Sequence, residues 1–369
     1  MTAALCVLTA GFTALLLLIQ RPLRKNGSAA RCFLFFAVKL ILASAAALSV
    51  LVLDTWASWH LGLLVTAVYA ALFPAAWADL FCGLYGLIRK RAGGSRPLSY
   101  KGTVVLTVCL SALFLLYGTV NEKRSSVTTY TVTSNKLSQP YTVVFISDIH
   151  YGDPNEPDKL RADVALINAA EPDLVILGGD ITDDFSTRPE MEKAYAILGE
   201  IHAPTYFIFG NHDRQAHAFL ANGHKYTEAE LTQTIEANGI TVLRDTAVMI
   251  GNDFILIGRE DESRADGRKA LCDIGNTDHS AFLLIADHQP YDTEELAPFG
   301  ADLQLSGHSH AGQLFPNSLF MELTGHNTYG RYAIDGTTLI VTAGEGVWHT
   351  PFRTDSHGEI LIVKLVPAE

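Results

Sequence analysis

Three stretches of the chain decide its fold: TVVFISDIH at 142–150, DLVILGGD at 173–180 and TYFIFGNHD at 205–213. Each starts as a short run of β-branched, aliphatic and aromatic residues, as strands do, and ends in a polar group that contains Asp, Asn or His. Helical patterns near 157–170 and 189–200 separate the three runs. The order βαβαβ predicts a parallel sheet with right-handed connections.

A third helical pattern lies near 227–238. After it, successive strand patterns are separated by shorter intervals and by fewer helices. They lie at 253–258, 281–286, 302–306, 338–343 and 359–365. They indicate a second sheet packed on the first. We therefore expect 141–369 to form one α/β domain, an α/β/β/α sandwich. The polar, Ser/Thr-rich residues 121–140 are expected to be a linker that could include one leading strand.

The residues before this domain carry a net positive charge, whereas the domain itself is net negative. Residues 1–120 contain two acidic and ten basic residues, a balance of +8, whereas residues 121–369 contain 37 acidic and 17 basic residues, a balance of −20. A domain with this negative excess lacks the clustered Lys and Arg that neutralise phosphates along a nucleic acid. We expect no nucleic-acid partner.

Four apolar runs lie within 1–120, at 3–19, 32–53, 61–88 and 103–120. Each is close to the ~20 residues that cross ~30 Å of hydrocarbon as a helix. Four such runs in succession leave no polar face for water. The sequence therefore predicts four transmembrane helices over 1–120 and a lipid bilayer as a partner.

The loops between these helices predict their orientation. The first and third loops together carry nine Lys and Arg residues, and the second loop, around 54–60, carries none. Because basic residues are retained on the cytoplasmic side, loops one and three should be cytoplasmic. This places everything after residue 120 on the extracytoplasmic face of the cell membrane.

Two ionisable residues, Lys39 and Asp79, interrupt the apolar runs at similar depths. A charge within a bilayer is costly unless it is paired, snorkels or faces a polar cavity. An ion pair between helices is the interpretation we favour. Independent snorkelling and a transport or proton-relay role are the alternatives.

The candidate chemistry lies at the ends of five predicted strands, where open α/β sheets place their ligands. Taken singly, each polar group is weak evidence for a metal site, since a His at a strand end is more often an ordinary hydrogen-bonded loop residue than a ligand. Together they supply a mixture of oxygen and imidazole donors suited to first-row divalent ions such as Mn, Fe or Zn. The candidate metal ligands are Asp148, His150, Asp180, Asn211, His288, His308 and His310.

In this order the motifs D-x-H, G-D, G-N-H-[ED], H and G-H-x-H resemble those of the calcineurin-like metallophosphoesterases, over residues 141–365. The chain is similar in particular to membrane-anchored bacterial cell-envelope members, whose last motif commonly reads H-T-H-G-G-Q; here 308–313 reads HSHAGQ, with Ala311 in place of one glycine. The resemblance implies a fold, a reaction and a division of ligands. One metal would be held by Asp148, His150, Asp180 and His310, and the other by Asp180, Asn211, His288 and His308.

Physical chemistry agrees with this division. Two cations about 3.5–4 Å apart need a shared carboxylate, for which Asp180 is suited, and they can generate a bridging hydroxide near neutral pH. His212 directly follows the predicted ligand Asn211, and the backbone would have to be contorted for both side chains to bind metal. His212 is therefore available to protonate the leaving oxygen as a general acid. Asp213 is expected to orient His212. The alternative for His212 and Asp213 is a structural turn.

Other residues near these motifs are open to two interpretations. Asp183 and Asp184 could bind a cation, but a solvated position at a helix start is the simpler expectation. Arg214 and Arg353 could hold a phosphate oxygen or an acidic head group. The remaining histidines match no motif and are expected in loops or on the surface.

The sequence therefore predicts an N-terminal polytopic α-helical membrane region followed by an α/β metallophosphoesterase domain. The expected function is two-metal hydrolysis of a phosphorylated small molecule or lipid-linked substrate by a metal-bridged hydroxide, with a phosphodiester or pyrophosphate of the membrane or envelope favoured. Two alternatives are a non-catalytic scaffold of the same fold and a membrane sensor or transporter with a regulatory phosphatase domain. The sequence does not indicate an oligomeric state.

Overall fold

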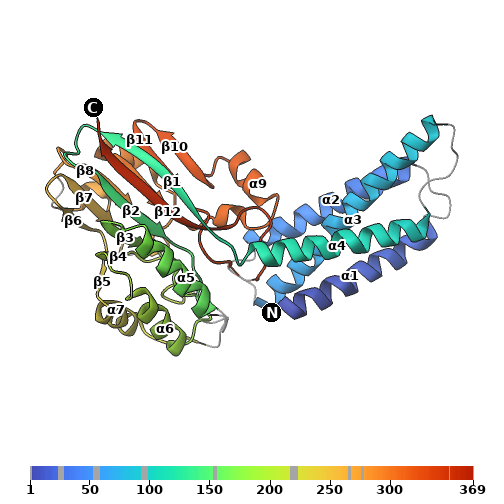
Figure 1. The fold of residues 1–369 in the computed structure, drawn as a ribbon, viewed down its shortest axis with the longest axis horizontal. Helices are drawn as coiled ribbons and strands as arrows, with labels where there is room; N and C mark the ends of the chain where they lie inside the picture. Colours follow the sequence, from blue (N-terminus) through green and yellow to red (C-terminus); the bar gives the residue numbers. More distant parts are fainter. Residues whose placement is uncertain are drawn as a thin grey trace. The chain divides into compact units, whose positions relative to one another are not determined.

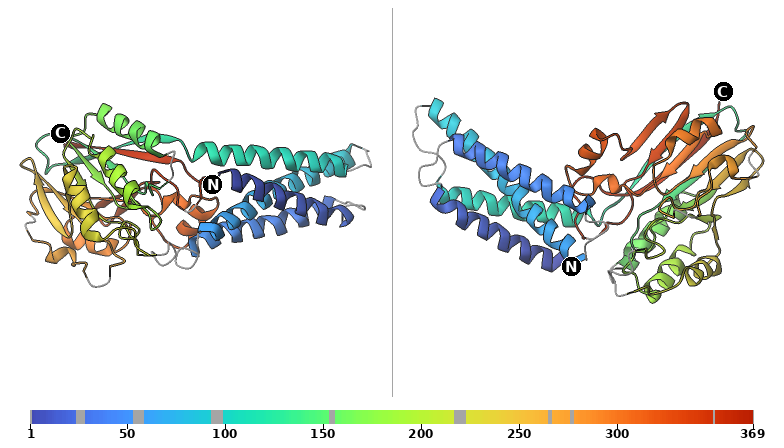
Figure 2. Two further views of the ribbon diagram at one scale, coloured as in Figure 1. Left: turned by 90° about the horizontal axis from the view of Figure 1, so that it is seen from below. Right: turned by 180° about the vertical axis from the view of Figure 1, so that it is seen from behind.

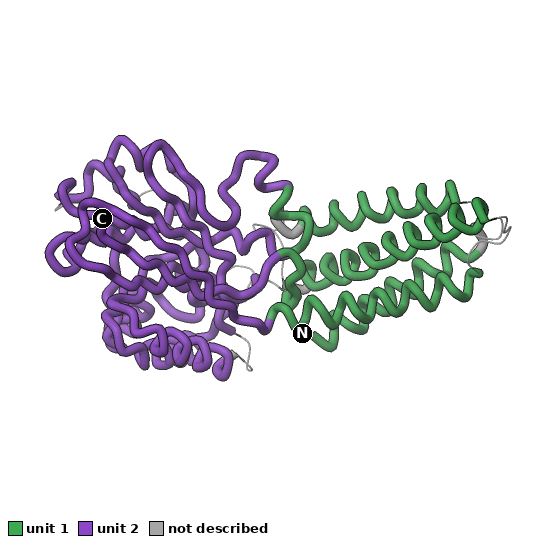
Figure 3. Tube along the Cα trace, turned by 45° about the horizontal axis from the view of Figure 1, so that its top comes forward, with its two compact units in different colours: residues 1–122, 314–319, 349–355 green, residues 123–313, 320–348, 356–369 purple. Residues whose placement is uncertain are grey.

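The computed structural model describes residues 2–23, 29–52, 59–92, 99–152, 156–216, 223–264, 267–275, 278–348 and 350–368. These residues form two compact units, drawn in two colours in Figure 3. The first unit comprises Met1–Glu122, Leu314–Leu319 and His349–Asp355. The second comprises Lys123–Gln313, Phe320–Trp348 and Ser356–Glu369.

The first unit contains four long helices (Figure 1). They are α1 (Thr2–Leu23), α2 (Ala29–Val52), α3 (Trp59–Arg91) and α4 (Tyr100–Asn121). All four are long and apolar enough to cross a membrane, with mean hydropathies of 1.8 to 2.3. The four helices predicted from the sequence are confirmed. The connections 24–28, 53–58 and 93–98, which carry part of the charge that predicts orientation, lie outside the described residues.

Lys39 and Asp79 meet in the interior of this unit. Lys39 Nζ lies 2.7 Å from Asp79 Oδ2 and donates a longer bond of 3.4 Å to the Ala75 carbonyl. The side chains are 7% and 1% exposed. The predicted interhelical ion pair is therefore present, and it joins α2 to α3.

The second unit contains two six-stranded sheets (Figures 1 and 2). The first sheet has the order β1 (Ser125–Ser134), β12 (Gly358–Pro367), β2 (Tyr141–Ile146), β3 (Leu174–Leu177), β4 (Thr205–Phe207) and β5 (Ile240–Val242). Strands β2 to β5 are parallel, as the βαβαβ pattern predicts, and β12 runs antiparallel to β2. Three helices accompany this sheet: α5 (Glu156–Ala169), α6 (Arg188–Leu198) and α7 (Glu228–Ala237).

Strand β1 occupies much of the segment that the sequence suggests as a linker. It pairs in parallel with β12 over its full length, from Ser125 opposite Gly358 to Ser134 opposite Pro367. The leading strand for which the sequence left room is thus ten residues long and forms one edge of the sheet. Its burial alternates, with Val127, Thr129, Thr131 and Thr133 exposed, which suits an edge strand with one face toward solvent.

The second sheet has the order β10 (Gly330–Ile334), β11 (Thr337–Val341), β9 (Leu303–Ser306), β8 (Phe282–Ala286), β7 (Phe254–Gly258) and β6 (Thr246–Ile250). Its central strands β7, β8, β9 and β11 are parallel, and nearly all of their residues are buried, so both of their faces are covered. Short helical segments connect its strands: η3 (Leu271–Asp273), η4 (Thr293–Glu295), α8 (Leu296–Phe299), η5 (His310–Gly312) and α9 (Asn317–Leu323).

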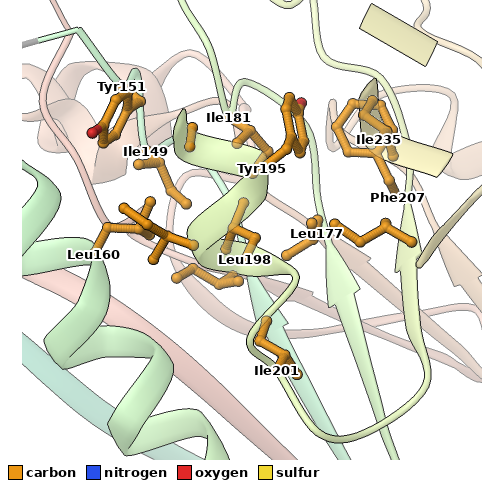
Figure 4. Close-up of a cluster of buried hydrophobic side chains, with 14 of the residues drawn as sticks. Ile149, Tyr151, Leu160, Leu177, Ile181, Tyr195, Leu198, Ile201, Phe207 and Ile235 are labelled. Atoms are coloured by element: carbon orange, nitrogen blue, oxygen red, sulfur yellow. The ribbon is translucent and has the colours of Figure 1, made fainter. Parts of the chain in front are cut away.

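The buried apolar residues fall into layers that define the sandwich. One cluster, which includes Leu177, Leu198 and Phe207, fills the space between the first sheet and its helices (Figure 4). A second cluster, which includes Phe145 and Phe282, joins the inner faces of the two sheets. A third packs η3 and α8 on the outside of the second sheet. The predicted α/β/β/α sandwich is confirmed, with a thin outer layer on the second sheet.

Candidate metal centre

The polar residues that end β2, β3, β4, β8 and β9 converge. In the first cluster, ligand atoms of Asp148, His150 and His310 lie within 4.8 Å of one another. The Nε2 atoms of the two histidines are 3.0 Å apart, and His310 Nε2 lies 3.6 Å from Asp148 Oδ1. Residues 160 positions apart in the chain thus point their donor atoms at one small volume.

The second cluster contains Asp180, His288 and His308. His288 Nδ1 donates to the Gly178 carbonyl at 2.8 Å, which fixes the ring so that Nε2 lies 3.1 Å from Asp180 Oδ2. The rings of His288 and His308 are 5.2 Å apart, centroid to centroid. A backbone acceptor behind one nitrogen is the usual way a protein aims the other nitrogen of a histidine at a metal.

Asp180 connects the two clusters. Its Oδ2 atom lies 3.1 Å from Nε2 of His288 and 3.9 Å from Nε2 of His150, which belong to different clusters. Asn211, the remaining predicted ligand, is buried, and its Oδ1 atom has no hydrogen-bond partner among the described residues. A buried amide oxygen without a partner is costly, so this atom fits the place of a ligand to a cation.

The backbone at these ligands is strained. Five of the seven predicted ligands have positive φ, from 48° to 68°: Asp148, His150, Asp180, His308 and His310. Such residues cost on the order of 1–3 kcal/mol each and cluster at functional sites. The His308 amide offsets part of this by donating to both carboxylate oxygens of Asp148, at 3.0 and 3.1 Å.

Two glycines allow the loops to approach the ligand carboxylates. A Cβ atom at Gly210 would collide with the carboxylate of Asp180, and one at Gly307 would collide with that of Asp148. Both glycines stand directly before the motifs that supply ligands. The glycines in G-N-H-D and G-H-S-H therefore serve close approach of the backbone rather than turn formation alone.

The partner of His212 differs from the one expected. His212 Nδ1 lies 2.5 Å from Asp184 Oδ2, and both side chains are buried. The carboxylate of Asp213 instead accepts backbone N–H bonds of 2.8 to 3.1 Å from Gly210, Asp180, Ile181 and Thr182. The expectation that Asp213 orients His212 is wrong. Asp213 holds the loops after β3 and β4 together, because a carboxylate next to several free amides is their best acceptor.

Asp183 and Asp184 are also not solvated residues at a helix start. Asp183 Oδ2 lies 3.1 Å from Nδ1 of His150, behind the first cluster, and Asp184 lies behind His212. The side chain of Asp183 is 15% exposed and that of Asp184 is 4% exposed. Adjacent carboxylates thus orient two different histidines.

Burial and charge set the protonation of the second cluster. Burial lowers the pKa of His288, but the adjacent Asp180 outweighs it and raises this pKa to about 10. Burial lowers the pKa of His308 to about 3, and the charge on His288 acts in the same direction. The pKa of Asp180 is held well below its usual range, since the charges of His288 and His212 outweigh the effect of burial. An ionised carboxylate between imidazoles is a suitable site for divalent cations.

Of the two arginines suggested as phosphate contacts, Arg214 is engaged by an aromatic ring and two carboxylates of the second unit. Arg214 lies 3.6 Å above the Phe209 ring and pairs with Glu228 and Glu260 at 3.1 and 2.8 Å. Arg353 is fully buried and belongs to the first unit.

Two aromatic residues that the motifs do not reveal lie beside the centre. The Trp348 ring is 5.9 Å from that of His212, and the Tyr291 ring is 5.7 Å from that of His308. Gln313 holds Trp348 through bonds of 2.8 and 2.9 Å to its backbone N–H and carbonyl. Gln313, which follows H-S-H-A-G in the sequence, is the signal from which this support of Trp348 could have been predicted.

Residues 141–312 match the family model described as calcineurin-like phosphoesterase. An uncharacterized metallophosphoesterase of Helicobacter pylori is 29% identical over 246 residues, covering 63% of this chain and 62% of that protein. A transmembrane protein with metallophosphoesterase domain from Danio rerio is 29% identical over 294 residues, covering 73% and 64%. The chain thus spans less than two thirds of the length of either relative.

Among solved structures, a dimetal phosphatase from Danio rerio aligns with 55% of this chain and 87% of its own, with a TM-score of 0.38 and 12% identity.

Proposed function

We propose that the chain, whose residues 141–312 match the calcineurin-like phosphoesterase family model, is a membrane-bound, two-metal phosphohydrolase. The observation that carries the proposal is that six of the seven predicted ligands fall into two groups able to hold a metal ion, with Asp180 of the second group 3.9 Å from His150 of the first. The buried, unpartnered Oδ1 of Asn211 supports it among the described residues. A scaffold without catalysis would gain nothing from such a costly arrangement.

We assign the ligands to two divalent cations, Mn, Fe or Zn, which suit mixed oxygen and imidazole donors. One would be held by Asp148, His150, Asp180 and His310, and the other by Asp180, Asn211, His288 and His308. Once bound, such a pair would neutralise phosphate charge and lower the pKa of water.

His212 is the proposed general acid. Its Nδ1 lies against Asp184, and we assign the proton donation to Nε2. Water attacks phosphorus, the bond from phosphorus to the leaving oxygen breaks, and the Nε2 proton passes to that oxygen; the attacking water releases one proton to solvent, and His212 takes a proton back from solvent before the next turnover. Asp184 would keep the ring in place and stabilise its protonated form, as a carboxylate does for a catalytic histidine. Asp213 contributes indirectly, through the loops that carry Asp180 and His212.

We further propose that this domain lies outside the cytoplasm and acts on a phosphodiester or pyrophosphate of the membrane or envelope. The basic residues at the opposite ends of the helices, such as Arg21, Arg89 and Lys101, support the orientation. Cys272, which is exposed in the second unit, provides a direct test. An impermeant maleimide should label it in intact cells, and Cys272→Ser should abolish that labelling; labelling only after permeabilisation would reverse the orientation.

The reaction is tested with the purified full chain, stripped of metal and reloaded with Mn, Fe or Zn, against phosphomonoesters, phosphodiesters and pyrophosphates. His212→Asn should keep both metals and slow turnover ~10²- to 10⁴-fold, the usual contribution of a general acid. The loss should be smaller for nitrophenyl esters, whose leaving group needs no proton. Metal binding without turnover of any substrate would support the scaffold interpretation instead.

A further inference from the structure

The segment 344–346, which reads Gly-Glu-Gly and follows β11, runs against the loop that carries the predicted ligand Asp148. The backbone N–H of Glu345 donates to the Ser147 carbonyl at 2.9 Å, and that of Gly346 donates to the Asp148 carbonyl at 2.7 Å. All of these residues belong to the second unit. The two successive bonds fix the main chain at a residue of the first cluster.

Only residues without a side chain fit at either end of this segment. A Cβ atom at Gly344 would lie 2.7 Å from Cβ of Asp148, and one at Gly346 would lie 2.1 Å from the Ile149 carbonyl oxygen. Gly344 also has a φ of 70°, in the left-handed region that favours glycine. Glu345 is therefore the one residue of the segment whose side chain can anchor it.

The side chain of Glu345 is fully buried, and β1 and α5 hold it. Its Oε1 atom accepts a hydrogen bond from Ser125 Oγ of β1 at 2.6 Å and forms an ion pair with Lys159 of α5. Lys159 Nζ also donates to the backbone carbonyl of Glu345 at 2.9 Å, so one lysine holds both its side chain and its main chain. Helix α5 itself packs beside the ligand loop, since its Leu160 belongs to the same buried cluster as Ile149 (Figure 4).

A second carboxyl group completes this arrangement. Ser125 Oγ also lies 2.7 Å from Asp163 Oδ1 of α5. Because a hydroxyl donates only one proton, it can serve one carboxylate, and the other carboxyl group must supply a proton of its own. Asp163 suits that role, since burial and the charge of Glu345 raise its pKa to about 7. Glu345 then keeps its negative charge beside Lys159.

The backbone at the first cluster needs such support. Asp148 and His150 have φ of 56° and 48°, a region in which a residue other than glycine stays only when its surroundings fix it. We propose that the Glu345 carboxylate is a positioning group for the first metal site, through which the segment 344–346 holds the loop that carries these two ligands. The inference rests on the proposed two-metal centre, and Glu345 acts on it through the backbone rather than as a ligand.

Stepwise metal binding to the full chain tests the inference without an activity assay. The metal-free protein in detergent is titrated with Mn²⁺ against a chelator, and His150→Ala and His288→Ala, which each remove a ligand of one cluster, identify the two binding steps. Glu345→Gln keeps the shape of the side chain and removes its charge. It should weaken the step of the first cluster about 10- to 100-fold, the usual effect of losing a group that supports a ligand, and leave the other step nearly unchanged.

Two further variants separate positioning from a general loss of stability. Asp302 also pairs with a lysine, Lys136, at 2.8 Å, but it stands before β9, and the ligand His308 follows the other end of that strand. Asp302→Asn should therefore lower the unfolding temperature and change neither binding step. Ser125→Ala removes one hydrogen bond of Glu345 and no charge, so it should weaken the step of the first cluster by a smaller factor.

The outcomes distinguish this inference from the proposed function. Two ions bound by the wild-type chain, with both steps unchanged or equally weakened in Glu345→Gln, would overturn the inference alone, because a merely structural residue does not move one step by itself. If Glu345→Gln does not fold, an unchanged first step in Ser125→Ala overturns it. Fewer than two ions in the wild-type chain would overturn the metal centre and the inference with it.

Discussion

The neighbouring carboxylates Asp183 and Asp184 should have separable functions, because each contacts a different histidine. Asp183 stands 3.1 Å behind His150, a predicted ligand, and Asp184 stands 2.5 Å behind His212, the predicted acid. The variants Asp183→Asn and Asp184→Asn keep size and shape and remove one charge each. They are therefore matched controls for one another.

The structure sets the expected magnitudes. A hydrogen bond to a charged group contributes about 1.5–3 kcal/mol, and one decade of rate corresponds to about 1.4 kcal/mol. Asp184→Asn should therefore lower kcat roughly 10- to 150-fold at saturating metal, with two metals still bound. Asp183→Asn should instead weaken metal affinity about 10- to 100-fold, as loss of a carboxylate behind a metal-binding histidine does. Its kcat should recover at high metal concentration.

The assay combines metal content after dialysis, metal affinity by chelator competition, and turnover of esters with good and poor leaving groups. Because Asp184 acts through His212, adding Asp184→Asn to His212→Asn should cost little more than His212→Asn alone. Full additivity in that double variant would refute the pairing. Loss of metal in Asp184→Asn, or unchanged metal affinity in Asp183→Asn, would show that Asp183 does not serve metal binding and Asp184 catalysis as proposed.

Three further changes test the site, the membrane unit and the second unit. Asp180→Ala removes the carboxylate shared by both clusters, so metal content should fall well below two ions per chain; two ions retained with activity would exclude the bridging role. Lys39→Met leaves Asp79 buried without its cation and should cost about 3–5 kcal/mol of stability, much of which Asp79→Leu in the same chain should restore; thermal unfolding in detergent measures both. Burial, together with the charge of Glu345, raises the pKa of Asp163 to about 7. The folded state therefore keeps a proton that the unfolded state releases near pH 4, and stability should fall as pH rises from about 4 to 7 by roughly 4 kcal/mol at most. Asp163→Asn should flatten that slope in denaturant titrations, and an unchanged slope would contradict the assignment.

Strands and helices with strong periodicity could be predicted from the sequence. The four apolar helices and the strands that carry the motifs lie within a few residues of their expected positions, because burial on both faces leaves an uninterrupted apolar run. The strands at 240–242, 246–250 and 330–334 were not predicted. They are short or half exposed, and their residues pair at sheet positions that only the tertiary fold defines.

The candidate site shows the same division between local and tertiary information. Its ligand types follow from strand ends, and the structure brings these residues together. The partner of His212 does not follow from proximity in sequence. Asp213 is adjacent, but its carboxylate turns toward backbone amides, whereas Asp184 reaches His212 from another loop across 28 positions. Which of several nearby carboxylates orients a histidine depends on loop geometry that spacing cannot supply.

The contacts of the two clusters give a reason for the proposed sharing of Asp180. His288 is oriented from behind by a backbone carbonyl, which is neutral, whereas His150 is oriented by the charged Asp183. The first cluster therefore has one carboxylate of its own, Asp148, and a second, Asp183, behind His150, whereas the second cluster depends on Asp180 for negative charge. An ion at the second cluster would be held mainly by neutral imidazole and amide donors. We therefore expect that cluster to lose its metal first when Asp180 is replaced, and stepwise metal analysis of Asp180→Asn, with one tight ion remaining, would check this order.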